Sequence, residues 1–241
     1  MLGAGLLLAP VVAALVHAGP GVVALGQWTP ARALPRGWCR WRGPAVSQVA
    51  LTFDDGPDPD STPRVLDRLD ERGLRGTFFC LGSRVRETPE LVAETLLRGH
   101  EIGVHGFVHA HHLARHPGWV TADLDAALEA LAECGVEPRW YRPPYGQVSA
   151  GTLRAARSRG LELVHWSAWG REWEAPDGQS VAERVSRSLE PGAIVLLHDS
   201  DVTSPQGTVD RVIDALGLIA DDLDRRGFSS VTLSQMVPST S

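Results

Sequence analysis

The stretch TFDDGP at residues 52–57 decides the fold and the chemistry that we expect of this chain. The run 49–53 before the first aspartate is rich in apolar and β-branched side chains, which predicts a buried strand. Asp54 and Asp55 then stand at the end of that strand, and Gly-Pro turns the chain. Two adjacent carboxylates at the rim of a sheet suit a metal ligand and a neighbouring general base.

Beyond this strand, short β-like runs alternate with helical patterns, as in a parallel β/α fold. Six further strands are predicted at 77–81, 101–105, 140–142, 162–165, 193–198 and 230–233. Amphipathic segments predict helices over 62–72, 89–98, 121–134, 150–159, 179–190 and 208–226. We therefore predict an α/β fold, a distorted (β/α) barrel similar to a TIM barrel, with about seven parallel strands.

Reactive side chains fall at or just past the C-terminal ends of five predicted strands, at Asp54 and Asp55, His105, Arg142, Trp166 and His198. In a parallel barrel those ends meet on one face, where active sites are built. The segment from His105 to His109 adds two imidazoles in an HxxxH spacing. Two histidines and one carboxylate make the open three-ligand site of a catalytic divalent metal.

Two further motifs carry reactive groups. In RPPYG at 142–146, the double proline holds Arg142 rigidly, so that its guanidinium can face a carboxylate. A rigid turn with a surface arginine is the alternative interpretation. In IVLLHD at 194–199, an apolar strand delivers His198 to the rim, where it suits protonation of a leaving amine. A lone histidine after a strand is also a common structural feature.

The four motifs in this order resemble the polysaccharide deacetylases of carbohydrate esterase family 4, also called the NodB-homology domain. TFDDGP and RPPYG match the family pattern unaltered, and the resemblance covers about 46–237. It implies a distorted (β/α) barrel that removes N- or O-acetyl groups from glycans with one divalent metal. Zinc is the metal that the resemblance favours, and a His₂Asp site also accepts cobalt, nickel or manganese.

The resemblance also implies roles for individual residues. Asp55, His105 and His109 would bind the metal. Asp54, held by Arg142, would act as general base, the backbone N–H of Tyr145 would stabilise the oxyanion, and His198 would protonate the departing sugar amine. Apart from the resemblance, we expect Pro143, Trp169 and Trp173 to contact the substrate, the tryptophans as an apolar floor for a sugar ring or its acetyl methyl group. For Trp166 and its neighbouring tryptophans, core and rim packing is the alternative. We expect His111, His112 and His116 to be solvated loop residues.

Two positions depart from the family pattern. The second motif normally reads His-Ser/Thr-x-x-His, whereas Gly106 stands here at the hydroxyl position. The fourth motif normally supplies an Asp-x-x-Asp-Trp run, whereas this chain has Trp169 and Glu172 at the two aspartate positions. The residue that tunes His198 is therefore missing or replaced by Glu172.

Length, net charge and cysteine content limit the class of protein. A length of 241 residues favours one domain. The formal net charge of -6, without a basic stripe, argues against nucleic-acid binding. Three cysteines without metal-type spacing predict no disulfide framework. We expect a monomer.

The amino terminus has a distinct composition. Residues 1–26 are almost wholly apolar and long enough to span a bilayer, which predicts a membrane anchor or an export signal, with a buried helix as the alternative. The arginines that follow would favour a cytoplasmic body if the segment inserts, which conflicts with an exported one. Residues 27–45 read as a linker, and 46–237 as the catalytic domain.

We therefore expect a membrane-anchored or exported protein of a bacterial cell envelope. It would deacetylate an N-acetylated sugar of an envelope polysaccharide or a lipid-linked glycan. Two alternatives remain open. One is a deformylase or other C–N hydrolase of the same fold. The other is a glycan-binding protein that kept the fold and lost turnover, which the altered fourth motif favours.

Overall fold

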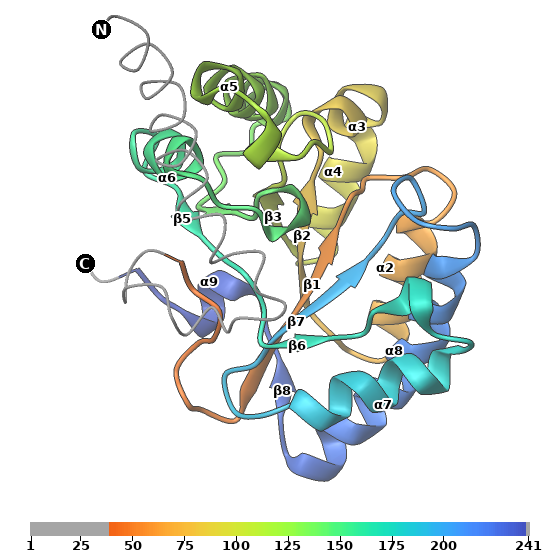
Figure 1. The fold of residues 1–241 in the computed structure, drawn as a ribbon. Helices are drawn as coiled ribbons and strands as arrows, with labels where there is room; N and C mark the ends of the chain where they lie inside the picture. Colours follow the sequence, from red (N-terminus) through yellow and green to blue (C-terminus); the bar gives the residue numbers. More distant parts are fainter. Residues whose placement is uncertain (1–38, 240–241) are drawn as a thin grey trace, which may run out of the picture.

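A computed structural model describes residues 39–239, whose centre is a curled sheet of parallel strands (Figure 1). The strands are β1 (Gln48–Asp54), β2 (Gly76–Cys80), β3 (Glu101–Val104), β4 (Trp140–Tyr141), β5 (Glu162–Leu163), β6 (Ala168–Trp169), β7 (Ile194–His198) and β8 (Ser229–Ser230). Their order is β5-β4-β3-β2-β1-β7-β6, and β8 pairs with β1 off this path. Seven parallel strands in one curled path confirm the predicted distorted barrel.

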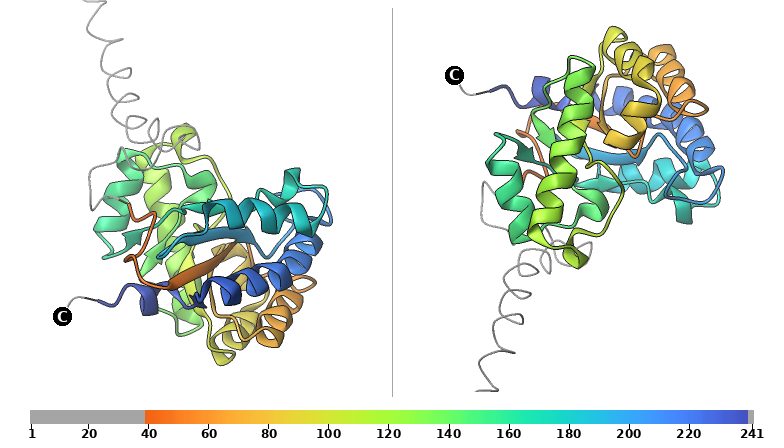
Figure 2. Two further views of the ribbon diagram at one scale, coloured as in Figure 1. Left: turned by 90° about the horizontal axis from the view of Figure 1, so that it is seen from below. Right: turned by 90° about the horizontal axis from the view of Figure 1, so that it is seen from above.

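Helices cover the outside of the sheet (Figures 1 and 2). They are α2 (Thr62–Glu71), α3 (Gly82–Glu87), α4 (Pro89–Leu97), α5 (Pro117–Glu133), α6 (Ala150–Arg157), α7 (Gly178–Ser188), α8 (Thr208–Arg226) and α9 (Leu233–Met236). Neighbours pack in the order α6, α5, α3, α4, α2, α8, α7, which follows the order of the strands. Each β/α unit thus lies beside the next, and the C-terminal strand ends share one rim.

Strand β1 lies at the centre of the sheet, and its side chains are buried from Val49 onward. Phe53 stacks on Phe78 of β2 with ring centroids 4.8 Å apart, which locks these strands together inside the core. On the other side, the register with β7 sets Asp54 opposite His198. The pairing of the two central strands therefore brings the first and last predicted catalytic residues together.

The segment just before β1 closes part of the barrel. Arg40 forms a β-bridge with Val164, beyond β5, and Arg42 forms one with Ala193, beside β7. Part of the segment 39–45, which we expected to belong to a linker, therefore pairs with residues next to β5 and β7. The rest of that linker, 27–38, and the apolar segment 1–26 lie outside the described residues. Between residues 39 and 239, no helix is long and apolar enough to cross a membrane.

Short elements differ from the predictions. Strand β6 and helix α3 were not predicted, because two and six residues are too few for a hydrophobic period to be recognised. Of the strand predicted at 230–233 only Ser230 is confirmed, since β8 is Ser229–Ser230 and Thr232 caps helix α9 with a reciprocal capping box to Gln235. Helix α5 begins at Pro117, four residues before the predicted start.

Candidate active site

The two aspartates of TFDDGP end strand β1 and face the same imidazole. Successive strand residues normally point to opposite faces of a sheet. Asp55 departs from the strand with φ of 82°, a left-handed backbone that is uncommon for residues other than glycine. As a result, one oxygen of Asp54 lies 3.9 Å from His105 Nε2, and one oxygen of Asp55 lies 3.3 Å from the same atom.

Asp55, His105 and His109 form the predicted cluster of metal ligands. Asp55 Oδ1 lies 3.3 Å from His105 Nε2 and 3.4 Å from His109 Nε2. One possible ligand atom from each residue lies within 4.8 Å of the others. Two atoms that each bind a tetrahedral zinc ion at about 2.1 Å are about 3.4 Å apart. The spacing of the cluster therefore fits a divalent metal.

The hydrogen bonds of the cluster also fit a cation. His105 Nδ1 lies 2.7 Å from the carbonyl oxygen of Arg142, which can only accept, so Nδ1 carries the proton. In the neutral ring the Nε2 lone pair then faces Asp55 Oδ1, a buried oxygen with no hydrogen bond within residues 39–239. Two electron-rich atoms at this distance repel each other unless a proton or a metal ion lies between them.

Burial and charge act in opposite directions on these ligands. Burial raises the pKa of Asp55, but the charges of the surrounding histidines outweigh burial and hold the pKa below its usual range. Burial lowers the pKa of His105, but the charges of Asp54 and Asp55 raise it overall. For His109 burial prevails and lowers the pKa to about 4, which favours the neutral ring that binds metal.

Arg142 is fully buried and holds Asp54. Its Nη1 donates to Asp54 Oδ1 at 2.8 Å and to Thr52 Oγ1 at 2.7 Å, and its Nη2 donates to the carbonyl oxygen of His165 at 2.9 Å. The guanidinium also lies over the Phe79 ring, 4.3 Å from the centroid. The interpretation as a surface arginine is therefore wrong. A buried ion pair with further hydrogen bonds holds the Asp54 carboxylate in one orientation.

Tyr145 lies beside the metal-ligand cluster, after the two prolines of RPPYG. Its backbone is left-handed, with φ of 58°, and its side chain is exposed. The ring lies between His109, with centroids 4.2 Å apart, and His111, which stacks on it at 3.7 Å. Gln147 contacts the same His111 through a hydrogen bond of 2.8 Å. His111 is exposed, as expected, but its ring packs against Tyr145.

His112 differs from the expectation of a solvated loop. It is fully buried, and its Nδ1 lies 3.3 Å from Thr152 Oγ1 of helix α6. His116 is exposed, and its ring accepts a hydrogen bond from the Gly118 N–H at the start of helix α5.

His198 ends strand β7 and pairs with Glu172. Its Nδ1 lies 2.7 Å from Glu172 Oε1, and the glutamate is fully buried. Burial lowers the pKa of His198, but the charge and hydrogen bond of Glu172, with smaller effects of Asp55 and Asp54, raise it to about 10. His198 Nε2 lies 4.0 Å from Asp55 Oδ2, so the ring also faces the metal-ligand cluster. Glu172, which stands at the altered position of the fourth motif, therefore contacts His198 and raises its pKa.

A cavity of about 330 Å³ opens between these groups and is lined by Asp54, His105, His109, Tyr145, Gly146, Trp166, Trp169, Trp173, Leu196, His198, Thr203, Ser204 and Pro205. Its volume matches a small-molecule site. Trp166, Trp169 and Trp173 form a continuous row of rings with centroid spacings of 5.4 and 5.0 Å, and Trp173 meets the edge of His198. Pro143 is buried and does not line this cavity, so its predicted contact with substrate finds no support here.

Thr203 is a residue of the site that the sequence did not indicate. Its hydroxyl donates a short hydrogen bond to Asp55 Oδ2, whereas the other oxygen, Oδ1, faces His105 and His109. Thr203 lies in an irregular loop after β7, where no period or motif marks it. Asp199, in the same loop, is buried and accepts hydrogen bonds from Gly56 N–H and the Thr62 hydroxyl. This loop therefore supports the turn that carries both aspartates.

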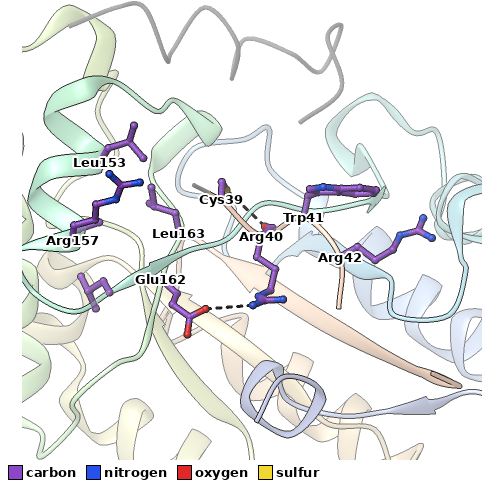
Figure 3. Close-up of a pocket in the computed structure, with 10 residues that line it drawn as sticks. Cys39, Arg40, Trp41, Arg42, Leu153, Arg157, Glu162 and Leu163 are labelled. Carbon is purple, nitrogen blue, oxygen red and sulfur yellow. Dashed lines mark hydrogen bonds and ion pairs between the residues drawn. The ribbon is translucent and has the colours of Figure 1, made fainter. Parts of the chain in front are cut away.

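A second cavity, of about 270 Å³, lies between the segment 39–42, helix α6 and strand β5 (Figure 3). Within it Arg40 faces Glu162 at 3.6 Å. None of the site residues named above is among the residues that line it, so it is separate from the candidate active site.

Comparison with known proteins agrees with this geometry. Residues 42–164 match the polysaccharide deacetylase family model. A peptidoglycan-N-acetylglucosamine deacetylase of Bacillus cereus is 34% identical, with 84% of this chain and 94% of the relative covered. A chitooligosaccharide deacetylase of Bradyrhizobium sp. is 36% identical over 78% of this chain and 90% of its own.

A solved structure, the Bc1960 peptidoglycan N-acetylglucosamine deacetylase, shares the fold with a TM-score of 0.81. It is 30% identical and covers 88% of this chain and 99% of its own. The resemblance inferred from the sequence motifs is thereby confirmed. The chain belongs to the polysaccharide deacetylase family, and it is a hydrolase of carbon–nitrogen bonds other than peptide bonds.

Proposed function

We propose that the protein is a metal-dependent deacetylase of an N-acetylated sugar in a cell-envelope polysaccharide or a lipid-linked glycan. The observation that carries the proposal is the convergence of Asp54, two histidines and His198 on one cavity, with the buried Asp55 in contact with all three histidines. The names of the relatives point to peptidoglycan and chitooligosaccharides, both built on N-acetylated sugars.

Asp55, His105 and His109 would hold the metal, most simply zinc, with cobalt, nickel or manganese as substitutes. When bound, a divalent cation supplies a Lewis acid that polarises the acyl carbonyl and makes a water molecule more acidic. Two neighbouring groups orient the ligands, because the Arg142 carbonyl oxygen accepts from His105 Nδ1 and the Thr203 hydroxyl donates to Asp55.

Asp54 would take the proton of the attacking water. It lines the cavity, lies 3.9 Å from His105, and is held by the buried Arg142 at 2.8 Å. This ion pair leaves Asp54 Oδ2 on the side of the metal ligands, while Oδ1 is bonded to the guanidinium. The carboxylate therefore has an oxygen directed toward the reacting atoms.

His198 would protonate the leaving amine. Glu172 accepts a hydrogen bond from His198 Nδ1 and raises the pKa of the ring, which favours its protonated form. The backbone N–H of Tyr145, which also lines the cavity, would donate to the oxyanion. The row of Trp166, Trp169 and Trp173 offers an apolar wall for the sugar ring or the acetyl methyl group.

A glycan-binding protein without turnover was favoured by the altered fourth motif alone. The contact of Glu172 with His198 supplies a carboxylate where that motif departs from the family, which removes this argument.

We also propose that residues 1–26 anchor or export a monomeric protein to the cell envelope. Membrane fractionation with and without this segment would test that part.

The test of the activity is acetate release by the full chain from N-acetylglucosamine oligomers and from peptidoglycan, with an N-formylated sugar in parallel. Asp54→Asn, which keeps the volume of the side chain, is the control for contaminating activity. Release of acetate by the wild type and not by this variant supports the proposal. Turnover of the formylated sugar alone would point to a deformylase, and turnover of none would reject a hydrolase of these sugars.

A further inference from the structure

Helix α5 carries a carboxylate where its period calls for an apolar side chain. Its buried face presents Val120, Leu124 and Ala127 to the core, and Asp123 lies on the same face with 7% of its surface exposed. Burying a carboxylate costs free energy unless hydrogen bonds compensate. Asp123 therefore has a role that packing of the helix does not explain.

Asp123 binds the backbone between the two histidine ligands. Its Oδ2 accepts from the Phe107 N–H at 2.9 Å, and its Oδ1 accepts from the Val108 N–H at 3.2 Å. The carbonyl oxygens of the same loop accept from helix α3, Gly106 from Gly82 N–H at 2.9 Å and Phe107 from Ser83 N–H at 3.0 Å. The loop from His105 to His109 is thus held from both sides.

The two histidines differ in how their rings are held. His105 is bonded through Nδ1 to the Arg142 carbonyl. His109 Nδ1 is buried and has no hydrogen-bond partner in the part of the chain that the structure describes. The position of His109 therefore depends on the backbone of its loop and on contact with Tyr145.

Gly106 and Asp123 form a matched pair. Gly106 has φ of 99°, which side chains rarely allow, and a Cβ there would lie 2.9 Å from Asp123 Oδ2. A serine or threonine at position 106, as the family motif has it, would be strained by this φ, and its Cβ would clash with the Asp123 carboxylate. The carboxylate on helix α5 thus occupies the space beside the loop that a residue with a side chain at position 106 would need.

We propose that Asp123 is the positioning residue of the metal-ligand loop, and that it replaces from helix α5 the hydroxyl that the family motif supplies at position 106. Two backbone hydrogen bonds to a carboxylate set the path of Phe107 and Val108, and this path sets where His109 stands relative to Asp55. The inference rests on the proposed metal site. Partners that orient metal ligands typically change metal affinity 10- to 100-fold when removed.

The test is metal binding by the full chain rather than activity. Zinc affinity is measured by competition with a chelating dye, and cobalt is used for its visible absorption spectrum, which reports ligand geometry. Asp123→Asn keeps the volume of the side chain and one acceptor, whereas Asp123→Ser removes the carboxylate without added bulk. The matched control is Asp125→Asn on the same helix, where Asp125 is exposed and bonded to Arg159.

We expect zinc affinity to fall about tenfold in Asp123→Asn and up to about 100-fold in Asp123→Ser, with an altered cobalt spectrum and no change in Asp125→Asn. If both Asp123 variants bind zinc like the wild type with unchanged cobalt spectra, the inference is wrong, even if the metal-free protein melts at a lower temperature. If the wild type itself binds no zinc, the proposed metal site fails instead.

Discussion

Replacement of Glu172 by glutamine tests most directly whether Glu172 raises the pKa of His198. Glutamine keeps the size of the side chain and an oxygen that can accept from His198 Nδ1, so the perturbation is mainly the loss of one charge. Glu172 is fully buried and lies 2.7 Å from His198, which leaves the pair little screened by solvent.

The magnitude follows from that contact. A hydrogen bond to a charged group contributes about 1.5–3 kcal/mol, and one pKa unit corresponds to about 1.36 kcal/mol. Loss of the charge should therefore lower the pKa of His198 by about 1–2 units. The full rise from 6.5 to about 10 does not measure the effect of Glu172 alone, because burial lowers the pKa of His198 while Asp55 and Asp54 also raise it.

The direction of the effect on rate is fixed by the role of His198. As the acid, His198 must carry a proton, so kcat/KM falls as the pH rises through its pKa. In Glu172→Gln this alkaline fall should move about 1–2 pH units lower, while the rate near pH 7 changes less. A bound metal lowers the pKa in both proteins and leaves the difference between them.

The assay is the pH profile of kcat/KM for acetate release between about pH 5 and 10.5, a range that spans the ordinary and the raised pKa of the histidine. Glu174→Gln is the matched control, since Glu174 lies two residues on, is exposed and pairs with Arg171 at 2.8 Å. Superimposed alkaline limbs for wild type and Glu172→Gln would refute the assignment. An equal shift in Glu174→Gln would also refute it, because that carboxylate does not contact His198.

Three further predictions concern the other site residues. Asp55→Ala should abolish zinc binding, measured by metal analysis after dialysis, whereas Asp54→Asn should retain zinc and lose turnover; equal zinc contents in both would contradict the division of roles. Thr203→Val, which removes the hydroxyl bonded to Asp55, should weaken zinc binding about tenfold in the same competition assay, and unchanged affinity would exclude a positioning role. Arg142→Met should lower the free energy of unfolding in urea by about 3–5 kcal/mol, because Asp54 is then buried without its partner. A loss below about 1 kcal/mol would mean that the ion pair does not hold the site together.

Much of the barrel could be predicted because its long elements carry strong local signals. The helix predicted over 208–226 matches α8 at both ends, where a glycine follows the last turn. The central strands were recognised from apolar runs, and their C-terminal ends carry the acid and metal groups. Parallel strands bring those ends to one rim, so the predicted cluster of Asp55, His105 and His109 followed from fold class and motif together.

The remaining site residues could not be predicted because they act through tertiary contacts. Thr203 lies in an irregular loop, and nothing near it in sequence marks its contact with Asp55, 148 residues away. Asp123 interrupts the apolar face of its helix, but the sequence does not show which backbone groups it binds, because Phe107 and Val108 lie about fifteen residues earlier in the chain. Strand β6 is too short for a period, although it carries Trp169 to the cavity.

The role of the metal is tested most directly by acetate release from the full chain before chelation, after chelation, and after zinc is returned, with bound metal measured in the same samples. We predict that release falls to background when the metal is removed and returns with about one zinc per chain, as expected for one three-ligand site. Full turnover by protein without detectable metal would contradict the central claim.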